Sequence, residues 1–360
     1  MTAVAPQPTE PSEPAQEVVR SGLHKRKVGG ITLGMGILVL LGLVVLASMA
    51  SIAIGAKSMP WSHAWDAIFH YDPKLEDHLI VRELRWPRTV LAMMIGAALG
   101  LAGAVMQGVT RNPLADPGLL GVNAGAALFV VIGISQFGIS DTSGLVWFAL
   151  VGAAAAGGFV YVLGAMGRGG ATPVKLAIAG AAMSALMASF TSALLLLDSA
   201  TLNVFRFWAV GSVAGRDIGV AKAVAPFIVV GIVMALLSGR ALNGLALGED
   251  VARSLGQRVG WVRAVAALSV VFLCGGATAA AGPIWFVGLT VPHVVRSITG
   301  PDHRWLLPYS MLVGAVFLTA ADIIGRVVVR PGELEVGIVT AVIGAPIFIA
   351  FVRRRRIAEL

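Results

Sequence analysis

The side chains able to do chemistry in this chain are few, and the clearest pair stands four residues apart. Asp322 and Arg326 lie within Ala321-Asp-Ile-Ile-Gly-Arg326, and Glu333 and Glu335 follow. Residues four apart share one side of a helix, so the carboxylate and the guanidinium can form a local ion pair. The alternative is a solvent-exposed Arg326 that is offered to an acidic partner. Both interpretations concern structure or binding rather than catalysis.

No catalytic or metal-binding motif of a common type is present in the sequence. The chain has no GxxxxGK[ST] loop for ATP, no GxSxG serine and no HExxH zinc motif. Cys274 is the only cysteine and lies in an apolar run, which predicts a buried small side chain. We therefore expect no catalytic residue, no metal site and no bound cofactor, so any ATP must be hydrolysed by a partner.

Two segments carry prolines that interrupt the apolar pattern. Pro283 and Pro292 break the stretch 282–296, and broken helices are a recurring feature of transport pathways. His293 follows at once, where it is either a proton relay or, more often, a structural hydrogen-bonding group.

The other interrupted segment reads Asn112-Pro-Leu-Ala-Asp-Pro117 and is followed by several glycines. Polar backbone at membrane depth is tolerated only where it is buried in protein or lines a cavity. One interpretation therefore places Asn112, Leu114 and Asp116 at the mouth of a transport pathway. The other is an ordinary loop in which Asp116 or Asn123 caps the next helix.

A polar loop at about residues 242–261 contains a short amphipathic pattern. Leu247, Val251 and Leu255 recur every four residues with charges between them, and Gly256 can end a helix there. Such a helix at the membrane face can dock in a groove of a partner protein. Alternatively, it lies among the lipid headgroups.

The composition places these segments in a membrane protein. Of the 360 residues, 57% are hydrophobic and 13% are charged, whereas a soluble domain has about 45–50% apolar and about 25% charged residues. The 44 glycines suit close packing of transmembrane helices. The net charge of +8 is distributed between apolar segments, so it indicates membrane orientation and argues against nucleic-acid binding.

The apolar segments predict an all-α integral membrane protein with about ten transmembrane helices in residues 30–352. Residues 1–29 form a polar extension whose composition is typical of disorder, and residues 353–360 form a basic tail. An even number of spans puts both termini on one side. The predicted spans are 30–54, 89–110, 117–137, 144–166, 176–197, 222–239, 262–281, 283–299, 305–323 and 335–352.

Lysine and arginine positions indicate which side that is. Cytoplasmic termini place most of these residues in inner segments, including both flanks, His24–Lys27 and Arg353–Arg356. The remaining cations fall on the outer side, where they are either tolerated charge or a docking surface for an acidic partner. Clustered among them are Arg82, Arg85, Arg88, Arg206, Arg216, Lys222, Arg326 and Arg330.

Five segments in a consistent order resemble one family of permeases, and the resemblance covers roughly residues 30–352. They are Arg85-Trp-Pro-Arg88, the G-A-x-L-x-x-x-G-x-x-x-Q helix Gly96–Gln107, the N-P-L-A-x-P-x-x-L-G segment Asn112–Gly121, the F-x-G-L-x-x-P-H-x-x-R segment Phe286–Arg296, and Ala321–Arg326 with Glu333–Phe348. In this pattern the chain resembles the permeases of iron-siderophore and vitamin B12 ABC importers, the FecCD-type or type II importers.

This resemblance implies a fold and a set of partners. It implies type II ABC importer permease architecture with ten transmembrane helices, in the cytoplasmic membrane of a bacterium. A second permease subunit, identical or homologous, would complete a central pathway. Two cytoplasmic ATPase subunits would bind ATP and Mg²⁺, and an extracytoplasmic binding protein would deliver the substrate. Membrane lipid is the remaining partner, and no nucleic acid is implied.

The resemblance also assigns roles to matching residues. It implies that Arg85, Arg88 and Arg326 dock the binding protein, and that Asn112 and Leu114 form the cytoplasmic gate. Glu335 stands where the family has proline, which alters the charge near the docking face. The residues implied to couple to the ATPase are Leu247, Gly248, Glu249, Ala252, Leu255 and Gly256.

The expected function is therefore that of a permease subunit for an iron-siderophore complex, with haem or vitamin B12 as alternative substrates. An ion-coupled secondary transporter is a rival, but it needs a coupling carboxylate or histidine within a span. Most acidic residues here lie at span ends or in loops. A non-transporting membrane scaffold is the second rival, and it would show no substrate flux.

Overall fold

A computed structural model describes residues 30–57, 59–167 and 170–354 of the chain. The predicted polar extension, 1–29, and nearly all of the basic tail lie outside these ranges. Every regular element in the described ranges is helical, which confirms the all-α prediction. The elements are α2 (Gly30–Ala53), α3 (Trp61–Phe69), α4 (Glu76–Leu79), the π-helix η1 (Ile80–Arg85), α5 (Trp86–Thr110), the 3₁₀ helix η2 (Pro117–Leu120), α6 (Val122–Phe137), α7 (Thr142–Ala165), α8 (Pro173–Leu197), α9 (Ser199–Ala209), α10 (Ile218–Leu237), α11 (Gly239–Ala246), α12 (Glu249–Ser254), α13 (Val259–Ala281), α14 (Val287–Thr299), α15 (His303–Val328) and α16 (Val336–Arg354).

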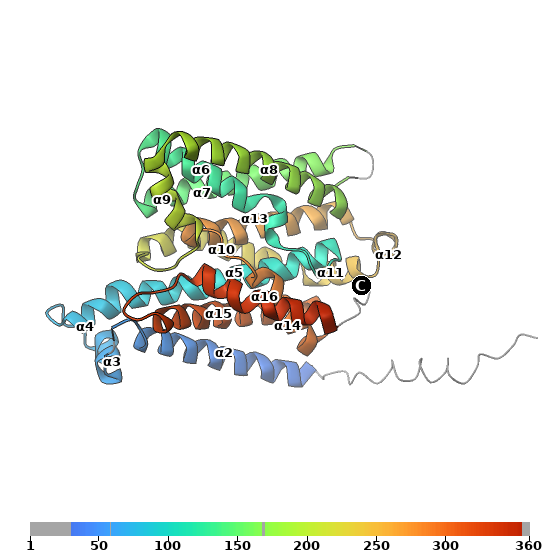
Figure 1. Ribbon diagram of the computed structural model, residues 1–360. Coiled ribbons are helices and arrows are strands. Elements are labelled where there is room, and N and C mark those ends of the chain that lie inside the picture. The colour runs from blue at the N-terminus through green and yellow to red at the C-terminus, as the bar shows by residue number, and fades with distance from the viewer. Residues whose placement is uncertain (1–29, 58, 168–169, 355–360) are drawn as a thin grey trace, which may run out of the picture.

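The long helices lie side by side in one bundle (Figure 1). Helix α2 begins and α16 ends at the same end of this bundle, close to α12 (Figure 1). We call this the α12 end. The short helices α3 and α4 lie at the opposite end, which we call the α3 end (Figure 1).

The centre of the bundle is built around α5 and α13. In each of these two, 78% of the most apolar window is buried, against 6% in α2 and 11% in α8. Apolar residues on an unburied helix face suit lipid or a partner helix rather than water. The bundle therefore has α5 and α13 inside and α2 and α8 at its periphery.

Glycines allow α5 to approach its neighbours closely. A Cβ atom at Gly103 would lie 1.8 Å from the Gly288 carbonyl oxygen of α14. A Cβ atom at Gly96 would lie 2.3 Å from the Gly314 carbonyl oxygen of α15. Small residues at such crossings are the usual way in which transmembrane helices come into backbone contact.

The helix break near residue 283 is where the sequence places it, but a second predicted break is wrong. Pro283 lies between α13 and α14, in a turn where Gly282 and Phe286 have φ values of 77° and 69°. Pro292 lies inside α14, which continues through it. A kinked or locally adjusted helix tolerates an internal proline when neighbouring groups satisfy the freed carbonyl.

Each of the ten predicted spans overlaps a helix of the bundle. Among the described residues, seven helices are long and apolar enough to cross a membrane, and α6 and α16 contribute shorter apolar helices. Helix α14, with 13 residues, is shorter than a straight crossing requires. The chain is thus a multi-pass membrane protein, while ten crossings and cytoplasmic termini stay predictions.

Candidate docking, gate and coupling sites

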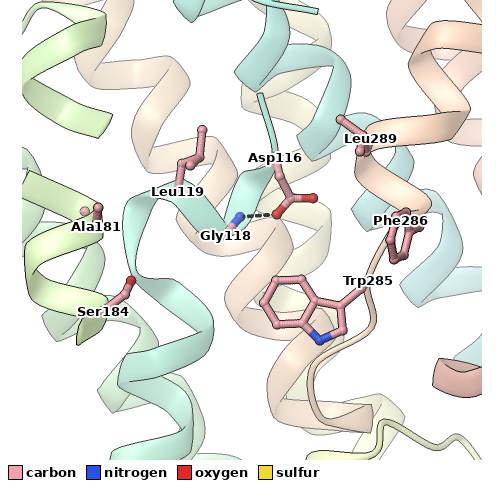
Figure 2. Close-up of a pocket in the computed structure, with 9 residues that line it drawn as sticks. Asp116, Gly118, Leu119, Ala181, Ser184, Trp285, Phe286 and Leu289 are labelled. Atoms are coloured by element: carbon pink, nitrogen blue, oxygen red, sulfur yellow. Dashed lines mark hydrogen bonds between the residues drawn. The ribbon is translucent and has the colours of Figure 1, made fainter. Parts of the chain in front are cut away.

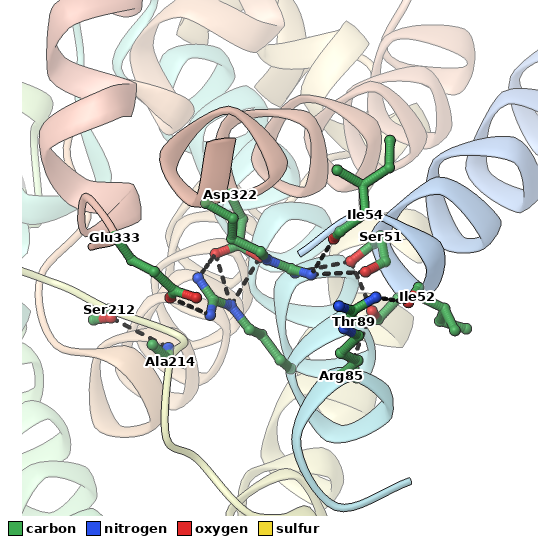
Figure 3. A network of polar contacts seen from close by, with 11 residues as sticks. Ser51, Ile52, Ile54, Arg85, Thr89, Ser212, Ala214, Asp322 and Glu333 are labelled. Carbon is green, nitrogen blue, oxygen red and sulfur yellow. Dashed lines mark hydrogen bonds and ion pairs between the residues drawn. The ribbon is translucent and has the colours of Figure 1, made fainter. Parts of the chain in front are cut away.

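Four buried charges at the α3 end, Arg85, Arg88, Asp322 and Arg326, form an arginine network with the more exposed Glu333 (Figure 3). Arg88 donates to Asp322 Oδ1 from Nε at 3.0 Å and from Nη2 at 2.8 Å, and its Nη1 lies 2.6 Å from Glu333 Oε2. Arg326 donates from Nε to Asp322 Oδ2 at 2.9 Å. One carboxylate is therefore shared by two guanidinium groups on α5 and α15.

Two of these arginines also bind the end of α2. The last carbonyls of a helix have no partner within it, and they carry partial negative charge. Arg326 Nη1 donates to the Ser51 carbonyl at 2.7 Å. Arg85 Nη1 donates to the carbonyls of Ile52 and Ala53 at 2.9 and 2.7 Å. Both guanidiniums thereby cap the C-terminus of α2 (Figure 3).

This geometry decides between the two interpretations of Arg326. The local pair with Asp322 is confirmed, and the expectation of a solvent-exposed arginine is wrong, because Arg326 is 1% exposed. Arg85 and Arg88 are also buried, at 5% and 9% exposure. Their donors are directed at internal carbonyls and carboxylates, so docking of a binding protein by these three residues stays a prediction.

The segment after α5 forms a tight loop at the α12 end. Arg111 ends α5 with φ of 50°, in the left-handed region. Asn112 Oδ1 then accepts from the Leu114 backbone N–H at 2.9 Å, and both side chains are exposed. Asp116 Oδ1 accepts from the Gly118 N–H at 2.7 Å and caps η2, which confirms a capping role for Asp116. Asn112 and Leu114 are thus held by a local turn.

A cavity of about 380 Å³ opens beside this loop. Ala181 and Ser184 of α8 line it on one side, and Trp285 and Phe286 line it on the other, with Asp116 near Trp285 (Figure 2). Asn123, the other proposed cap, instead accepts from Thr278 Oγ1 at 2.8 Å. Asp116 is the only carboxylate among the lining residues, which are Asp116, Gly118, Leu119, Gly180, Ala181, Ser184, Trp285, Phe286 and Leu289.

The predicted amphipathic helix is present as α12, but it is shorter than its pattern. Leu247 is the C-cap of α11 and lies before α12. The prediction that Leu247, Val251 and Leu255 share one helix is therefore wrong. Gly248, with φ of 105°, separates the two helices, and Gly256 follows with φ of 83°. The side chains of Leu247, Val251 and Leu255 are nevertheless all exposed. They form an apolar surface at the α12 end.

Helix α12 is tied to the bundle by one ion pair and one buried side chain. Glu249 pairs with the buried Arg263 of α13, and this hydrogen bond lowers the pKa of the Glu249 carboxyl. Arg111 precedes the loop of Asn112 and Leu114, which we call the gate loop after its predicted role, and acts on that carboxyl in the same direction. Ala252 is fully buried. The gate loop and α12 therefore lie close together.

A side-chain clamp joins α11 to the start of α15. Asn243 Nδ2 donates to Asp302 Oδ1 at 2.6 Å, and its Oδ1 accepts from the His303 backbone N–H at 2.8 Å. The His303 ring in turn lies against Gly108 near the end of α5. We call Asn243, Asp302 and His303 the Asn243 clamp. It connects the segment before α12 with the helix that leads into the gate loop.

These features agree with a match to a family of transport proteins. The FecCD transport family model matches residues 43–354, which is most of the chain. The chain belongs to the FecCD transport family.

Similar proteins extend over nearly the whole of this FecCD chain. The ferric enterobactin transport system permease protein FepD of Escherichia coli is 46% identical over 316 residues, which cover 88% of this chain and 94% of FepD. The hemin transport system permease protein HmuU of Yersinia pestis is 36% identical and covers 88% of this chain and 95% of HmuU.

A solved structure supports the same fold for this FecCD protein. It is described as an inward-facing conformation of a metal-chelate type ABC transporter, and it aligns with a TM-score of 0.78 and 27% identity. The alignment covers 90% of this chain and all of the solved one. Among the described residues of this FecCD protein, no three His, Cys, Asp or Glu side chains are grouped to hold a metal ion.

Sequence reasoning missed two parts of these sites. The sequence shows Glu333 only as a neighbour of the Asp322 segment, whereas in the structure it is an ion-pair partner of Arg88. Asn243 and His303 were not singled out. A polar amide beside the amphipathic pattern was the available signal for the clamp, but its partner lies 59 residues away at Asp302.

Proposed function

We propose that this chain is the permease subunit of an ABC importer that moves an iron-siderophore complex across the cytoplasmic membrane of a bacterium. The observation that carries the proposal is the match over residues 43–354, together with near full-length similarity to permeases named for ferric siderophores. In this function the chain acts with a second permease subunit, two ATPase subunits that hold ATP and Mg²⁺, and a substrate-binding protein.

The α12 end is the cytoplasmic end in this proposal. Support comes from the placement of both described ends of the chain at that end (Figure 1) and from the basic residues in its loops. Ten crossings return the chain to the side on which it starts. The α3 end, with the arginine network, then faces the binding protein.

The coupling surface is assigned to the exposed part of α12 and its flanks. Exposed Leu247 and Leu255 offer apolar contacts, and the buried Ala252 and the paired Glu249 fix the helix against α13. Gly248 and Gly256 bound the segment with positive φ values, which allow the tight turns. Arg111, at the end of α5, acts electrostatically on Glu249, which supports coupled movement of α12 and the loop of Asn112 and Leu114.

The docking role of Arg85, Arg88 and Arg326 is proposed as indirect. Their side chains hold the end of α2 and the loop before α16, and so shape the outer face. Exposed cations at the same end, such as Arg82 and Arg206, supply charge for acidic residues of the binding protein. Rim charges of this kind affect mainly the association rate and its salt dependence.

Transport by the reconstituted complex tests the function. Proteoliposomes that hold the chain with its cognate ATPase and binding protein are loaded with ATP, and uptake of radiolabelled iron-siderophore, haem and cobalamin is compared. ATP-dependent uptake of the iron-siderophore complex is the expected result. Preferential uptake of haem supports the alternative suggested by the similarity to HmuU.

Two further outcomes distinguish the rival classes. Uptake driven by an ion gradient in vesicles without the ATPase would establish a secondary transporter. No flux of any substrate with the complete complex and ATP would favour a non-transporting scaffold. Either result overturns the importer proposal.

A further inference from the structure

The short helix α3 lies across the end of the bundle rather than along it (Figure 1). It follows α2 after a loop and precedes α4 and η1. Ala64 and Ala67 on one side are 3% and 1% exposed, and they pack with Ile52 and Val81 in a small separate core. One side of α3 is therefore fixed against the protein.

A second side of α3 carries three large aromatic residues that the bundle leaves uncovered. Trp61, Trp65 and Phe69 are 59%, 49% and 63% exposed, and the Trp65 and Phe69 ring centroids are 5.1 Å apart. Their spacing of four residues places them in one stripe, since an α-helix has about 3.6 residues per turn. Exposed stripes of this size mark an interaction surface.

The third side of α3 is polar. At about 100° per residue, Ser62, Asp66 and His63 follow the aromatic stripe around the helix, and the buried alanines complete the circle. His63 Nδ1 lies 2.9 Å from Asp77 Oδ2. The helix thus has a protein side, an aromatic side and a water side in sequence, which is the pattern of a helix at a membrane surface.

The position of α3 along the membrane normal follows from α2. Helix α2 has 24 residues, so it spans about 36 Å, slightly more than the roughly 30 Å of a hydrocarbon core. Its apolar side chains are almost all unburied, as expected beside lipid. Helix α3 begins shortly after α2 ends, which puts it at the membrane–water boundary rather than far above it.

Exposed apolar residues continue from α3 onto the start of α5. Trp86 and Leu84 are 45% and 58% exposed. Trp86 also lines a pocket with Ala67 and Ile68 of α3, to which Val81 and Arg82 of η1 contribute. Tryptophan is enriched at both membrane–water interfaces because its ring is apolar and its N–H needs a polar partner. The aromatic stripe is therefore part of a band at one level.

We propose that α3 is an interfacial anchor whose stripe of Trp61, Trp65 and Phe69 inserts into the headgroup and acyl-chain boundary of the outer leaflet. The partner is the phospholipid surface. The inference rests on the chain spanning the membrane in the proposed orientation and does not depend on the transported substrate. Its structural effect is to fix the depth of η1, which carries Arg85, and with it the arginine network.

Cysteine accessibility within α3 tests the anchor with a matched control on the same helix. In a Cys274→Ser background, Phe69→Cys probes the aromatic side and His63→Cys, about 120° away around the helix, probes the water side. The full chain is reconstituted in phospholipid vesicles and treated with a membrane-impermeant maleimide. We expect Phe69→Cys to react at least about tenfold more slowly, since the thiolate that reacts is disfavoured in an apolar environment.

A second measurement uses a conservative variant. In the parent protein, lipids brominated near the headgroup should quench the fluorescence of Trp61 and Trp65, whereas iodide in the aqueous phase should not. The double variant Trp61→Phe with Trp65→Phe should lack this lipid-quenched fluorescence. Equal thiol reactivity at both positions, with iodide quenching of these tryptophans, would overturn the anchor. So would protection of Phe69→Cys only after the binding protein is added, because the stripe would then be a protein docking surface. These outcomes are independent of whether iron-siderophore uptake is observed.

Discussion

The Asp322 carboxylate lies between the guanidinium groups of Arg88 and Arg326, at 2.8 Å from Arg88 Nη2 and 2.9 Å from Arg326 Nε. Arg88 and Asp322 are 234 residues apart in the chain. Both oxygens of a buried carboxylate are therefore used to join α5 and α15 near the end of α2. Removal of one member leaves buried charge without compensation, which is costly in a low-dielectric interior.

Asp322→Ala should destabilise the folded protein by roughly 3–5 kcal/mol, because two buried guanidinium groups lose their shared partner. The measurement is the midpoint of thermal unfolding in detergent, monitored as the loss of monodisperse protein. Asp250→Ala is the matched control, since its side chain is fully exposed and its pair with Arg253 is a surface pair. Equal midpoints for the two variants would contradict a structural role for the network.

Charged residues at the outer face should be of two kinds: those that stabilise the fold and those that contact the binding protein. Arg85→Lys replaces a fork that binds three carbonyls, those of Ile52, Ala53 and Lys57, by a single ammonium. We expect a loss of about 1–3 kcal/mol of stability with little change in association with the binding protein. Arg82→Glu, on an exposed side chain over Tyr71, should instead slow association and reduce its salt dependence.

Association kinetics at low and high salt distinguish the two effects. If Arg85→Lys melted like the parent protein but lost the salt-dependent part of association, Arg85 would be a direct contact, as the family resemblance implies. A loss of association only in proportion to unfolded protein would support the scaffold role.

The helices could be predicted from the sequence because their signal is local. A run of apolar residues long enough to span a membrane is visible in any window, and each predicted range overlaps a helix. The short helix α3 was not predicted, because its aromatic stripe includes only three residues between polar neighbours. Pro292 was read as a break because the pattern does not show which neighbours satisfy the freed carbonyl.

The arginine network could be predicted only in part for a related reason. The Asp322–Arg326 pair follows from a spacing of four, whereas Arg88 meets Asp322 only after folding. The orientation rule counts arginines by side of the membrane and treats them as exposed. The rule does not take into account that the last carbonyls of α2 require hydrogen-bond donors. Arg85 and Arg326 supply these donors and are buried as a result.

Close backbone approach at Gly103 makes a sharp prediction about packing. Gly103→Ala puts a methyl group where the Gly288 carbonyl oxygen lies, so α5 and α14 must separate, at about 1–3 kcal/mol or more. Gly158→Ala, on α7, meets nothing within 4 Å and should be neutral or stabilise by up to about 1 kcal/mol. The readout is the unfolding midpoint and the yield of folded protein, and a neutral Gly103→Ala would refute the crossing.

Acidification should release α12 from α13. The Glu249 pKa is lowered from 4.5 by the hydrogen bond from Arg263, so the pair stabilises the folded chain above that pH. The stabilisation is lost as the pH falls through the folded pKa. Amide exchange of residues 249–254 should therefore stay slow down to about pH 4.5 and accelerate, beyond its intrinsic pH dependence, as the pH falls further through the lowered Glu249 pKa. Glu249→Gln should show fast exchange on both sides of this pKa, and an unchanged profile in that variant would exclude the pair as the cause.

The Asn243 clamp should matter for coupling more than for ATP hydrolysis. Asn243 binds Asp302 and the His303 backbone, and the His303 ring lies against Gly108, about one helical turn before Asn112. Asn243→Ala leaves α12 and its exposed apolar surface in place but removes the side-chain link to α15. In the reconstituted complex we expect transport per ATP hydrolysed to fall several-fold while the ATPase rate is largely kept. Asn203→Ala, an exposed asparagine on α9, is the matched control. A proportional loss of both activities would assign Asn243 to folding alone, and no change in either would show that α11 and α15 are not linked through this side chain.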